Sequence, residues 1–318
     1  MIGMFMLMFF LFAYTNITMK GKTNAKNEMF RGFETLNITT LLDGATSEVV
    51  NGSTITITDA NTGEVSTLTY NGEMLSMTIP TNHTYIVKAK KIDGYMPPEK
   101  TEYVATKDGI RKITLNHQTP PAGVFICNMD GELIAAKDWT ATDNENPLGI
   151  YVGSSTHRIV IPYLFGYGYN FMYAYPKGYD NPELDFDGLN NTYHNYPPRL
   201  AGIDVDDAVE DAWEYKFPHG KQAYSPALGE ALMIHENKVA IQEALDKCSG
   251  NIPCFGGNAY NSIWTSTGGP DQEPIYVSLN GGYWGYSDCY DSYEEAREAE
   301  RNGDNIYATN KILPICLY

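Results

Sequence analysis

The sequence lacks most of the patterns that identify an enzyme or a metal protein. It contains no G-x-S-x-G, H-E-x-x-H or phosphate-binding glycine loop, and its six histidines stand in unrelated contexts. Its five cysteines are scattered, and no C-x-x-C pair indicates zinc. We therefore predict a non-enzymatic protein without a disulfide framework. The cysteines are expected to be buried free thiols, although Cys248 and Cys254 are close enough in sequence to pair.

A long apolar run is also missing. Residues 1–14 are apolar and uncharged, whereas a membrane-spanning helix needs about 20 residues. Their length fits the apolar part of a signal peptide, but no basic residues precede them and no small-residue cleavage site follows. Two interpretations stay open for residues 1–32: an apolar leader, or a wrongly assigned start, followed by a polar and disordered stretch.

Positive charge is scarce in the second part of the chain. Residues 1–119 carry 11 basic and 11 acidic side chains, whereas residues 120–318 carry 11 basic and 28 acidic ones. The net charge of −17 therefore resides after residue 119, where 19 of the 24 tyrosines also lie. Such an acidic surface repels phosphate backbones, which excludes nucleic acid as a partner. Tyrosine enrichment is typical of adaptable binding surfaces.

Residues 33–117 predict an all-β sandwich, because they contain alternating apolar and polar runs with turn signals between them. The expected strands are 36–41, 53–58, 64–70, 75–79, 83–89 and 111–115. The turn at Gly94-Tyr95 and the strands around it resemble prealbumin-like and Ig-like stalk modules of exported proteins. His83 and His117 are interpreted as surface residues. A proline-rich linker, 118–122, follows and separates this stalk domain from residues 123–318.

Residues 123–318 predict an α+β domain. Strands are expected at 123–127, 148–152 and 158–161. Ser225 before Pro226 predicts a helix N-cap, and a second helix with Val239, Ile241 and Leu245 facing the core is expected to end near Gly250. Alternating strands then run through 263–282, and 306–318 supplies a closing strand with Ile312, Leu313, Ile315 and Leu317 in the core.

The second domain resembles a known family. Asp-Phe-Asp-Gly at 185–188, YSPALGE at 224–230 and WTST at 264–267 resemble the C-type-lectin-like domains of gut-anaerobe surface proteins and their phages, including variable proteins of diversity-generating retroelements. Ser225, Ala227 and Ile263 depart from the family pattern, as does a helix expected at 292–302. The resemblance implies a lectin-like fold, an extracellular location on a bacterial surface or virion, and ligand recognition without catalysis.

Two constellations offer alternative chemistry. Asp180, Glu183, Asp185 and Asp187 precede Gly188, and clustered carboxylates beside a glycine suit Ca²⁺, with Asp185 and Asp187 as the ligands; a simple turn before a helix is the competing interpretation. Cys254 with His235 would be a thiol and base for a hydrolase. We predict no cofactor and treat both as the weaker hypotheses.

The predicted ligand-binding face consists of polar and aromatic residues late in the chain. A protein or glycan receptor on a cell surface is the expected partner, with oligomerisation through the stalk domain as a further possibility. Trp264 and Tyr276 are expected to fill the core instead. The Gly/Tyr-rich stretch Tyr163–Tyr179 is the alternative platform, and a purely structural fibre subunit is the alternative function. The face comprises Asn258, Tyr260, Asp271, Gln272, Glu273, Tyr283, Trp284, Tyr286, Asp288 and Tyr290.

Overall fold

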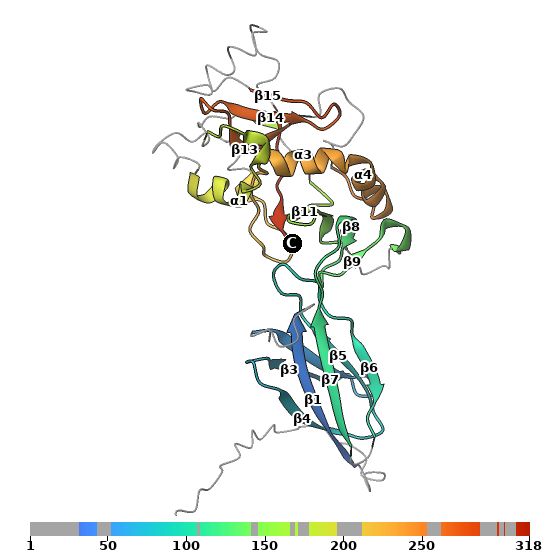
Figure 1. The fold of residues 1–318 in the computed structure, drawn as a ribbon. Helices are drawn as coiled ribbons and strands as arrows, with labels where there is room; N and C mark the ends of the chain where they lie inside the picture. The colour runs from blue at the N-terminus through green and yellow to red at the C-terminus, as the bar shows by residue number, and fades with distance from the viewer. Residues whose placement is uncertain are drawn as a thin grey trace, which may run out of the picture.

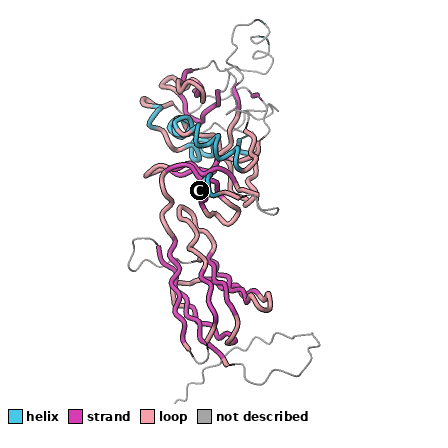
Figure 2. The backbone as a smooth tube through the Cα atoms, turned by 90° about the vertical axis from the view of Figure 1, so that its right-hand side faces the viewer, coloured by secondary structure: helices cyan, strands magenta, loops and turns pink. Residues whose placement is uncertain are grey.

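The computed structural model describes residues 32–42, 52–106, 109–140, 146–165, 169–170, 178–195, 212–252, 262–286, 298, 302 and 310–318. These residues are mostly β and form four sheets. Figure 1 shows two parts stacked end to end, with strands β1–β7 in the lower part and the helices and later strands in the upper part. The same arrangement is visible after a quarter turn in Figure 2.

The first part is a two-sheet sandwich, as the alternating sequence predicted. One sheet has the order β4-β1-β7 and the other β3-β2-β5-β6. Strand β1 pairs antiparallel with β4 and parallel with β7. The strand missed by the sequence prediction is β6. The strands are β1 (Phe33–Leu42), β2 (Thr54–Asp59), β3 (Val65–Thr69), β4 (Leu75–Pro80), β5 (Thr84–Ala89), β6 (Thr101–Val104) and β7 (Ile110–His117).

The core of the sandwich lies between these two sheets. Leu36 and Ile38 of β1 and Leu115 of β7 meet Ile55 and Val87 of the opposite sheet, all fully buried. Since side chains alternate along a strand, residues one position away face solvent, and this period of two is what the sequence displayed. The turn predicted at Gly94 is present, with a φ of 80° that glycine adopts without strain.

The surface assignment of the two histidines in this part was wrong. His117 is fully buried, because it shares the inward face of β7 with Ile113 and Leu115, and its Nε2 lies 3.4 Å from the Ser53 hydroxyl. Burial lowers the pKa of His117. His83 is partly buried, with Nδ1 2.5 Å from Asp59 Oδ2. Both histidines therefore have structural contacts that a single-sequence pattern did not indicate.

The second part combines two five-stranded sheets with helices. The sheet orders are β17-β11-β10-β8-β9 and β12-β16-β13-β14-β15. The first contains β8 (Gly123–Cys127), β9 (Leu133–Ile134), β10 (Gly149–Gly153), β11 (Arg158–Ile161) and β17 (Cys316–Leu317). The second contains β12 (Tyr169–Asn170), β13 (Ser262–Gly268), β14 (Pro274–Ser278), β15 (Trp284–Tyr286) and β16 (Asn310–Lys311).

Two longer helices lie between these sheets, and α3 and α4 each contact strands (Figure 1). Helix α3 touches β13 and β14, whereas α4 touches β8 and β10. Shorter helical segments precede them. The helical segments are η1 (Ala136–Asp138), η2 (Pro182–Leu184), α1 (Gly188–Asn190), the π-helical η3 (Asn191–Asn195), α3 (Leu228–Glu236) and α4 (Lys238–Lys247).

The start of α3 differs from the prediction. The N-cap is Ala227, not Ser225, and the first turn is capped by other side chains. The Thr267 hydroxyl accepts the Leu228 N–H at 2.8 Å, and the Glu230 carboxyl accepts the Ala227 N–H at 2.8 Å. Thr267 lies on β13, so a strand that follows much later in the sequence supplies the cap.

Helix α4 buries Ile241 and Leu245 as predicted, but Val239 is 66% exposed. The chain breaks its helical path at Asn237, which separates α3 from α4 and resets the phase of the apolar stripe. Val239 then lies in the first turn of α4 on the solvent side. The prediction for Val239 was wrong because residues two apart on a helix point in nearly opposite directions, so Val239 cannot share the buried face of Ile241 and Leu245.

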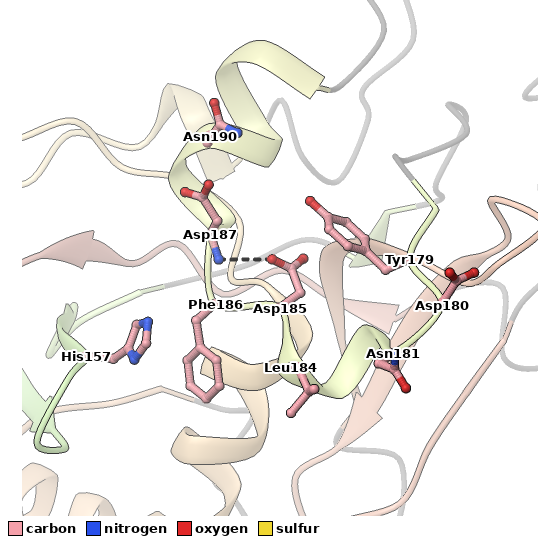
Figure 3. Close-up of a pocket in the computed structure, with 9 residues that line it drawn as sticks. All are labelled: His157, Tyr179, Asp180, Asn181, Leu184, Asp185, Phe186, Asp187 and Asn190. Atoms are coloured by element: carbon pink, nitrogen blue, oxygen red, sulfur yellow. Dashed lines mark hydrogen bonds between the residues drawn. The ribbon is translucent and has the colours of Figure 1, made fainter.

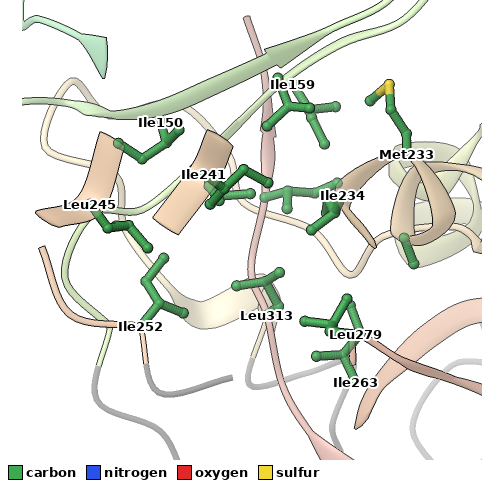
Figure 4. Close-up of a cluster of buried hydrophobic side chains, with 14 of the residues drawn as sticks. Ile150, Ile159, Met233, Ile234, Ile241, Leu245, Ile252, Ile263, Leu279 and Leu313 are labelled. Atoms are coloured by element: carbon green, nitrogen blue, oxygen red, sulfur yellow. The ribbon is translucent and has the colours of Figure 1, made fainter. Parts of the chain in front are cut away.

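The main core of the second part joins both sheets and both helices (Figure 4). Ile150 and Ile159 come from the first sheet, Ile263 from the second, and Ile234 and Ile241 from the helices. In the predicted closing strand Ile312, Leu313 and Ile315 are buried, whereas Leu317 is 46% exposed, contrary to expectation.

The thiols in the described residues are free and buried: Cys127, Cys248 and Cys316. The alternative disulfide from Cys248 is therefore not formed, and the prediction of a buried thiol is correct for these three positions. Burial raises the pKa of both Cys127 and Cys316 to about 12, which keeps these thiols protonated and unreactive at neutral pH.

The segment predicted as a linker is packed rather than free. Pro120 is buried, and the Tyr151 hydroxyl donates to the Pro121 carbonyl at 2.8 Å. The backbone of Gln118 pairs with Met96, and Lys221 Nζ lies 2.8 Å from Asp93 Oδ1 across the junction. The two parts therefore share specific contacts, although each has its own core.

We predict that each part still folds when the chain is divided at about Gln118, since the two cores are separate. Residues 32–118 and 119–318, expressed apart, should each unfold cooperatively in urea. The second should lose about 1 kcal/mol relative to the intact chain, because Lys221 no longer meets Asp93. Limited proteolysis that yields a scatter of fragments from either piece would contradict the division.

Candidate ligand-binding face

The predicted binding face is centred on β15, the last strand of the second sheet within the described residues. Strand β15 pairs antiparallel with β14, so that Trp284 lies opposite Val277 and Tyr286 opposite Ile275. Because side chains alternate along a strand, Trp284 and Tyr286 project from the same side. Their rings meet edge to face with centroids 5.7 Å apart.

The two rings differ in exposure. Tyr286 is 47% exposed, whereas Trp284 is half-buried and packs against the main core of the second part. Tyr283, in the turn before β15, is 56% exposed. Tyr286 is therefore the accessible ring of β15, and Trp284 supports it from the core side. Such a pair presents a rigid, amphipathic surface at low entropic cost.

The turn from Gly269 to Glu273 lies against Tyr286. Asp271 and Gln272 are exposed at its tip, and Gln272 adopts a φ of 69°. A side chain at position 269 would collide with the Tyr286 ring and come within 2.9 Å of Glu273 Oε2. The turn therefore brings Glu273 close to Tyr286, with Asp271 and Gln272 exposed at its tip.

Glu273 has an unusual environment. Its Oε2 atom is buried and finds no hydrogen-bond partner among the residues that the structure describes. A buried oxygen without a partner costs on the order of 1–3 kcal/mol. A donor on a ligand would recover that energy only if the turn Gly269–Glu273 shifts and exposes the oxygen.

Four predicted members of the face lie outside the described residues: Asn258, Tyr260, Asp288 and Tyr290. So do Cys254, most of the alternative platform Tyr163–Tyr179, and most of the helix expected at 292–302, of which Glu298 and Asn302 are described and helical. The two aromatic residues assigned to the core do pack together. Trp264 is buried and Tyr276 half-buried, with centroids 6.4 Å apart.

A groove of about 760 Å³ lies next to the turn. The Tyr179 N–H donates to the Gly268 carbonyl at 3.2 Å, which fixes one end of the groove beside β13. Figure 3 shows the His157 and Phe186 rings side by side in its wall, with centroids 4.1 Å apart. It is lined by His157, Tyr179, Asp180, Asn181, Leu184, Asp185, Phe186, Asp187 and Asn190.

Asp185, one of the two residues considered for Ca²⁺, has a different role. Its Oδ2 accepts hydrogen bonds of 2.6 Å from both Asn191 Nδ2 and Thr267 Oγ1, and its Oδ1 accepts the Asp187 N–H at 3.0 Å (Figure 3). Protein donors thus occupy the buried carboxylate, which pins the segment after η2 to β13. No group of three or more His, Cys, Asp or Glu in the described ranges is placed to hold a metal ion. Asp185 therefore serves as a structural hydrogen-bond acceptor in this fold.

A second buried carboxyl lies behind the groove. Glu230 is 1% exposed; its Oε2 accepts the Ala227 N–H, and the Tyr224 hydroxyl lies 2.8 Å from its Oε1. Burial raises the pKa of Glu230 to about 8, the hydrogen bonds from Ala227 and Tyr224 act in the opposite direction, and the neighbouring Asp185 adds to the rise. In the folded protein the Glu230 carboxyl is therefore protonated near neutral pH.

His235, considered as a base for Cys254, has a structural contact instead. Its Nδ1 lies 2.7 Å from the Leu279 carbonyl oxygen, and its ring packs so closely on Gly282 that any side chain there would collide with it. Lys238 also donates to the Asn280 carbonyl at 2.6 Å. These two contacts tie the helix break at Asn237 to the β14–β15 turn, and so position the strand that carries Tyr286.

Sequence reasoning missed the residues that hold the face in place. Thr267 donates to Asp185, 82 residues away in the sequence, and a single sequence carries no signal for such a pair. Asn191 and Tyr179 contact nearer partners, Asp185 and Asn191, at separations of 6 and 12 residues. Glu230 had a signal, since it is the third helical residue after the N-cap and its carboxyl accepts the N-cap N–H, as in a capping box.

Comparison with known proteins gave limited likeness. No family model and no curated protein matches the sequence. Among solved structures, the chain is similar to the Bacillus anthracis TIE protein, with 17% identity over 32% of this chain and 24% of that one, at a TM-score of 0.24. A shaft pilin, SpaA of Lactobacillus rhamnosus GG, has 10% identity over 36% of this chain and 69% of that one, also at 0.24.

Both neighbours are bacterial proteins, and overlaps of this size do not establish a shared fold or function. The chain spans about a quarter of the TIE protein. No helix in the described ranges is long and apolar enough to cross a membrane.

Proposed function

We propose that the protein recognises a protein or glycan receptor outside the cell, without catalysis, as part of a bacterial surface or a virion. The binding face is formed by Tyr286, Trp284 and the turn Asp271–Glu273. Strands β1–β7 act as the stalk that presents it. The C-type-lectin-like resemblance of residues 123–318 agrees with this role, as does the acidity of the second part, which steers positively charged partners.

One observation carries the proposal: an exposed tyrosine ring, supported by a half-buried tryptophan, lies beside a buried carboxylate oxygen that has no partner in the described chain. Binding hot spots combine an aromatic anchor with a polar group that a partner can satisfy. Among the described strands β15 lies at the edge of its sheet, and its Tyr286 ring is accessible to a partner.

Immobilised glycan and protein arrays test the proposal directly. We expect the whole chain to bind a defined subset, and residues 32–118 alone to bind none of it. Each ligand that binds should be recovered unchanged after prolonged incubation. Turnover that is lost in Cys254→Ala would instead show a hydrolase. An absence of any array signal, together with regular self-assembly seen by electron microscopy, would favour a structural fibre subunit.

A further inference from the structure

A second cavity, of about 780 Å³, lies where the two parts of the chain meet. Thr56 and Ile86 of the sandwich and the segment 88–100 form one side of it. The turn 129–132, Lys221 and Tyr318 of the second part form the other. Ligand sites occur preferentially between domains, and this volume falls in the range of roughly 300–1,000 Å³ that small-molecule sites occupy.

The cavity is basic, although the protein as a whole carries a net charge of −17. Its acidic lining residues number three, Asp93, Asp130 and Glu132, against five lysines and a histidine. The basic lining residues are Lys88, Lys90, Lys91, Lys100, His219 and Lys221. The lining of this cavity thus has more basic than acidic side chains, whereas the whole chain has more acidic than basic ones.

The acidic residues already have partners. Asp93 Oδ1 lies 2.8 Å from Lys221 Nζ, and Asp130 Oδ2 lies 3.7 Å from Lys88 Nζ. Glu132 Oε2 accepts a hydrogen bond of 2.7 Å from Asn128 Nδ2. Within the described residues, three of the lysines that line the cavity form no ion pair: Lys90, Lys91 and Lys100.

Lys91 is held in place within this cavity. Its stem packs on Gly131, where any added side chain would collide with it, and its Nζ lies 3.9 Å from the centroid of the Tyr318 ring. Burial and the nearby Lys221 together lower the pKa of Lys91 to about 8, although Asp93 acts in the opposite direction. Burial, Lys221 and Lys91 lower the pKa of His219 to about 4, so at neutral pH the positive charge of the cavity is that of its lysines. The cavity therefore has a positive potential that its own acidic residues do not cancel.

We propose that this cavity binds a small polyanion, a compound of about disaccharide size that carries two or more sulfate, carboxylate or phosphate groups. An anion beside Lys91 would offset the repulsion between its half-buried ammonium group and that of Lys221, and the exposed Lys90 and Lys100 add positive charge at the rim of the cavity. The ligand has to be short, because the acidic surface of the second part repels a long polyanionic chain. The site is separate from the face around Tyr286.

Calorimetric titration of the whole chain with three probes tests this site: a sulfated disaccharide, a neutral disaccharide of the same size, and inorganic sulfate at equal ionic strength. We expect the sulfated disaccharide to bind, the neutral one not to bind, and binding to weaken as salt rises. If inorganic sulfate binds as tightly as the sulfated disaccharide and through the same residues, the anion site is also supported, and its ligand is then a free inorganic anion.

Two sets of variants locate the binding. Lys91→Met keeps the apolar stem on Gly131 and should weaken binding of the sulfated disaccharide by about tenfold. The exposed pair Lys90→Gln and Lys100→Gln, which cannot disturb the core, should do the same. Lys112→Met, an exposed lysine on β7 away from the cavity, is the matched control and should bind as the wild type does.

Absence of binding by any anionic probe overturns the proposal, as does equal affinity of the Lys90, Lys91 and Lys112 variants. Both outcomes are independent of the receptor face, because Tyr286→Ala leaves the cavity intact. Loss of array binding with normal polyanion binding would therefore count against the face alone.

Discussion

Replacing Glu230 by alanine is expected to lower the free energy of unfolding by about 3 kcal/mol or more. The substitution leaves the Ala227 N–H and the Tyr224 hydroxyl without their partner in a fully buried site. It also opens a void beside Gly188, whose backbone packs directly on the Glu230 carboxyl. Urea unfolding measures the loss. Glu236→Ala, an exposed position on the same helix, is the control and should change stability by less than about 0.5 kcal/mol.

Glu230→Gln separates the hydrogen bonds from the charge. The amide reproduces the protonated acid, since its oxygen accepts the Ala227 N–H and its nitrogen faces the Tyr224 oxygen. The pKa of Glu230 is raised from 4.5 to about 8 in the folded chain, so the folded state keeps a proton that the unfolded state releases above 4.5. Its contribution to stability is therefore complete below 4.5 and is lost as the pH rises toward 8.

In that window the wild type should lose up to about 1.4 kcal/mol per pH unit relative to Glu230→Gln. The measurement is a set of urea midpoints for both proteins from pH 5 to pH 8 (a range set by the two pKa values). If the difference in unfolding free energy between the two proteins stays constant across this range, Glu230 is ionised in the folded state. Its pKa is then not raised by burial, and the predicted pH dependence is wrong.

Most elements of the fold could be predicted because their patterns are local. Strands β8 and β11 begin and end at the residues predicted for them, and the two helices lie where their apolar stripes predicted. One error comes from a contact between distant residues, since Thr267 of β13 replaces Ser225 as the cap of α3 and a local pattern does not carry this pair. The error at Val239 is local: it lies two residues before Ile241, on the other side of α4, and is exposed.

The candidate site shows the same division. The sequence indicated the turn Asp271–Glu273 and the rings of β15 by residue type, and the structure places them together. It did not indicate that Trp284 is half-buried while Tyr286, on the same side of β15, is exposed, because strand alternation alone does not tell how far the core extends under that side. Composition could not predict the basic cavity, because residues 1–119 are neutral overall and the lysines of the cavity come together only in the folded chain.

Truncating Tyr286 to alanine should weaken binding of an array-identified receptor by about thirtyfold, equivalent to about 2 kcal/mol. The ring is 47% exposed and covers Gly269 and Glu273, so its removal takes away the contact area of the face and leaves the sheet paired. The melting temperature should stay nearly unchanged. Surface plasmon resonance and thermal unfolding on the same preparations measure the two effects.

Trp284→Ala provides the contrast that makes this test specific. Because Trp284 packs on the core, its truncation should lower stability as well as affinity, by about 2 kcal/mol or more in unfolding free energy. Phe33→Ala, an exposed aromatic of the sandwich, is the matched control and should change neither quantity. If Tyr286→Ala binds as the wild type does while remaining folded, the receptor does not use β15. The groove beside Tyr179 then becomes the face to test, since it adjoins the same turn.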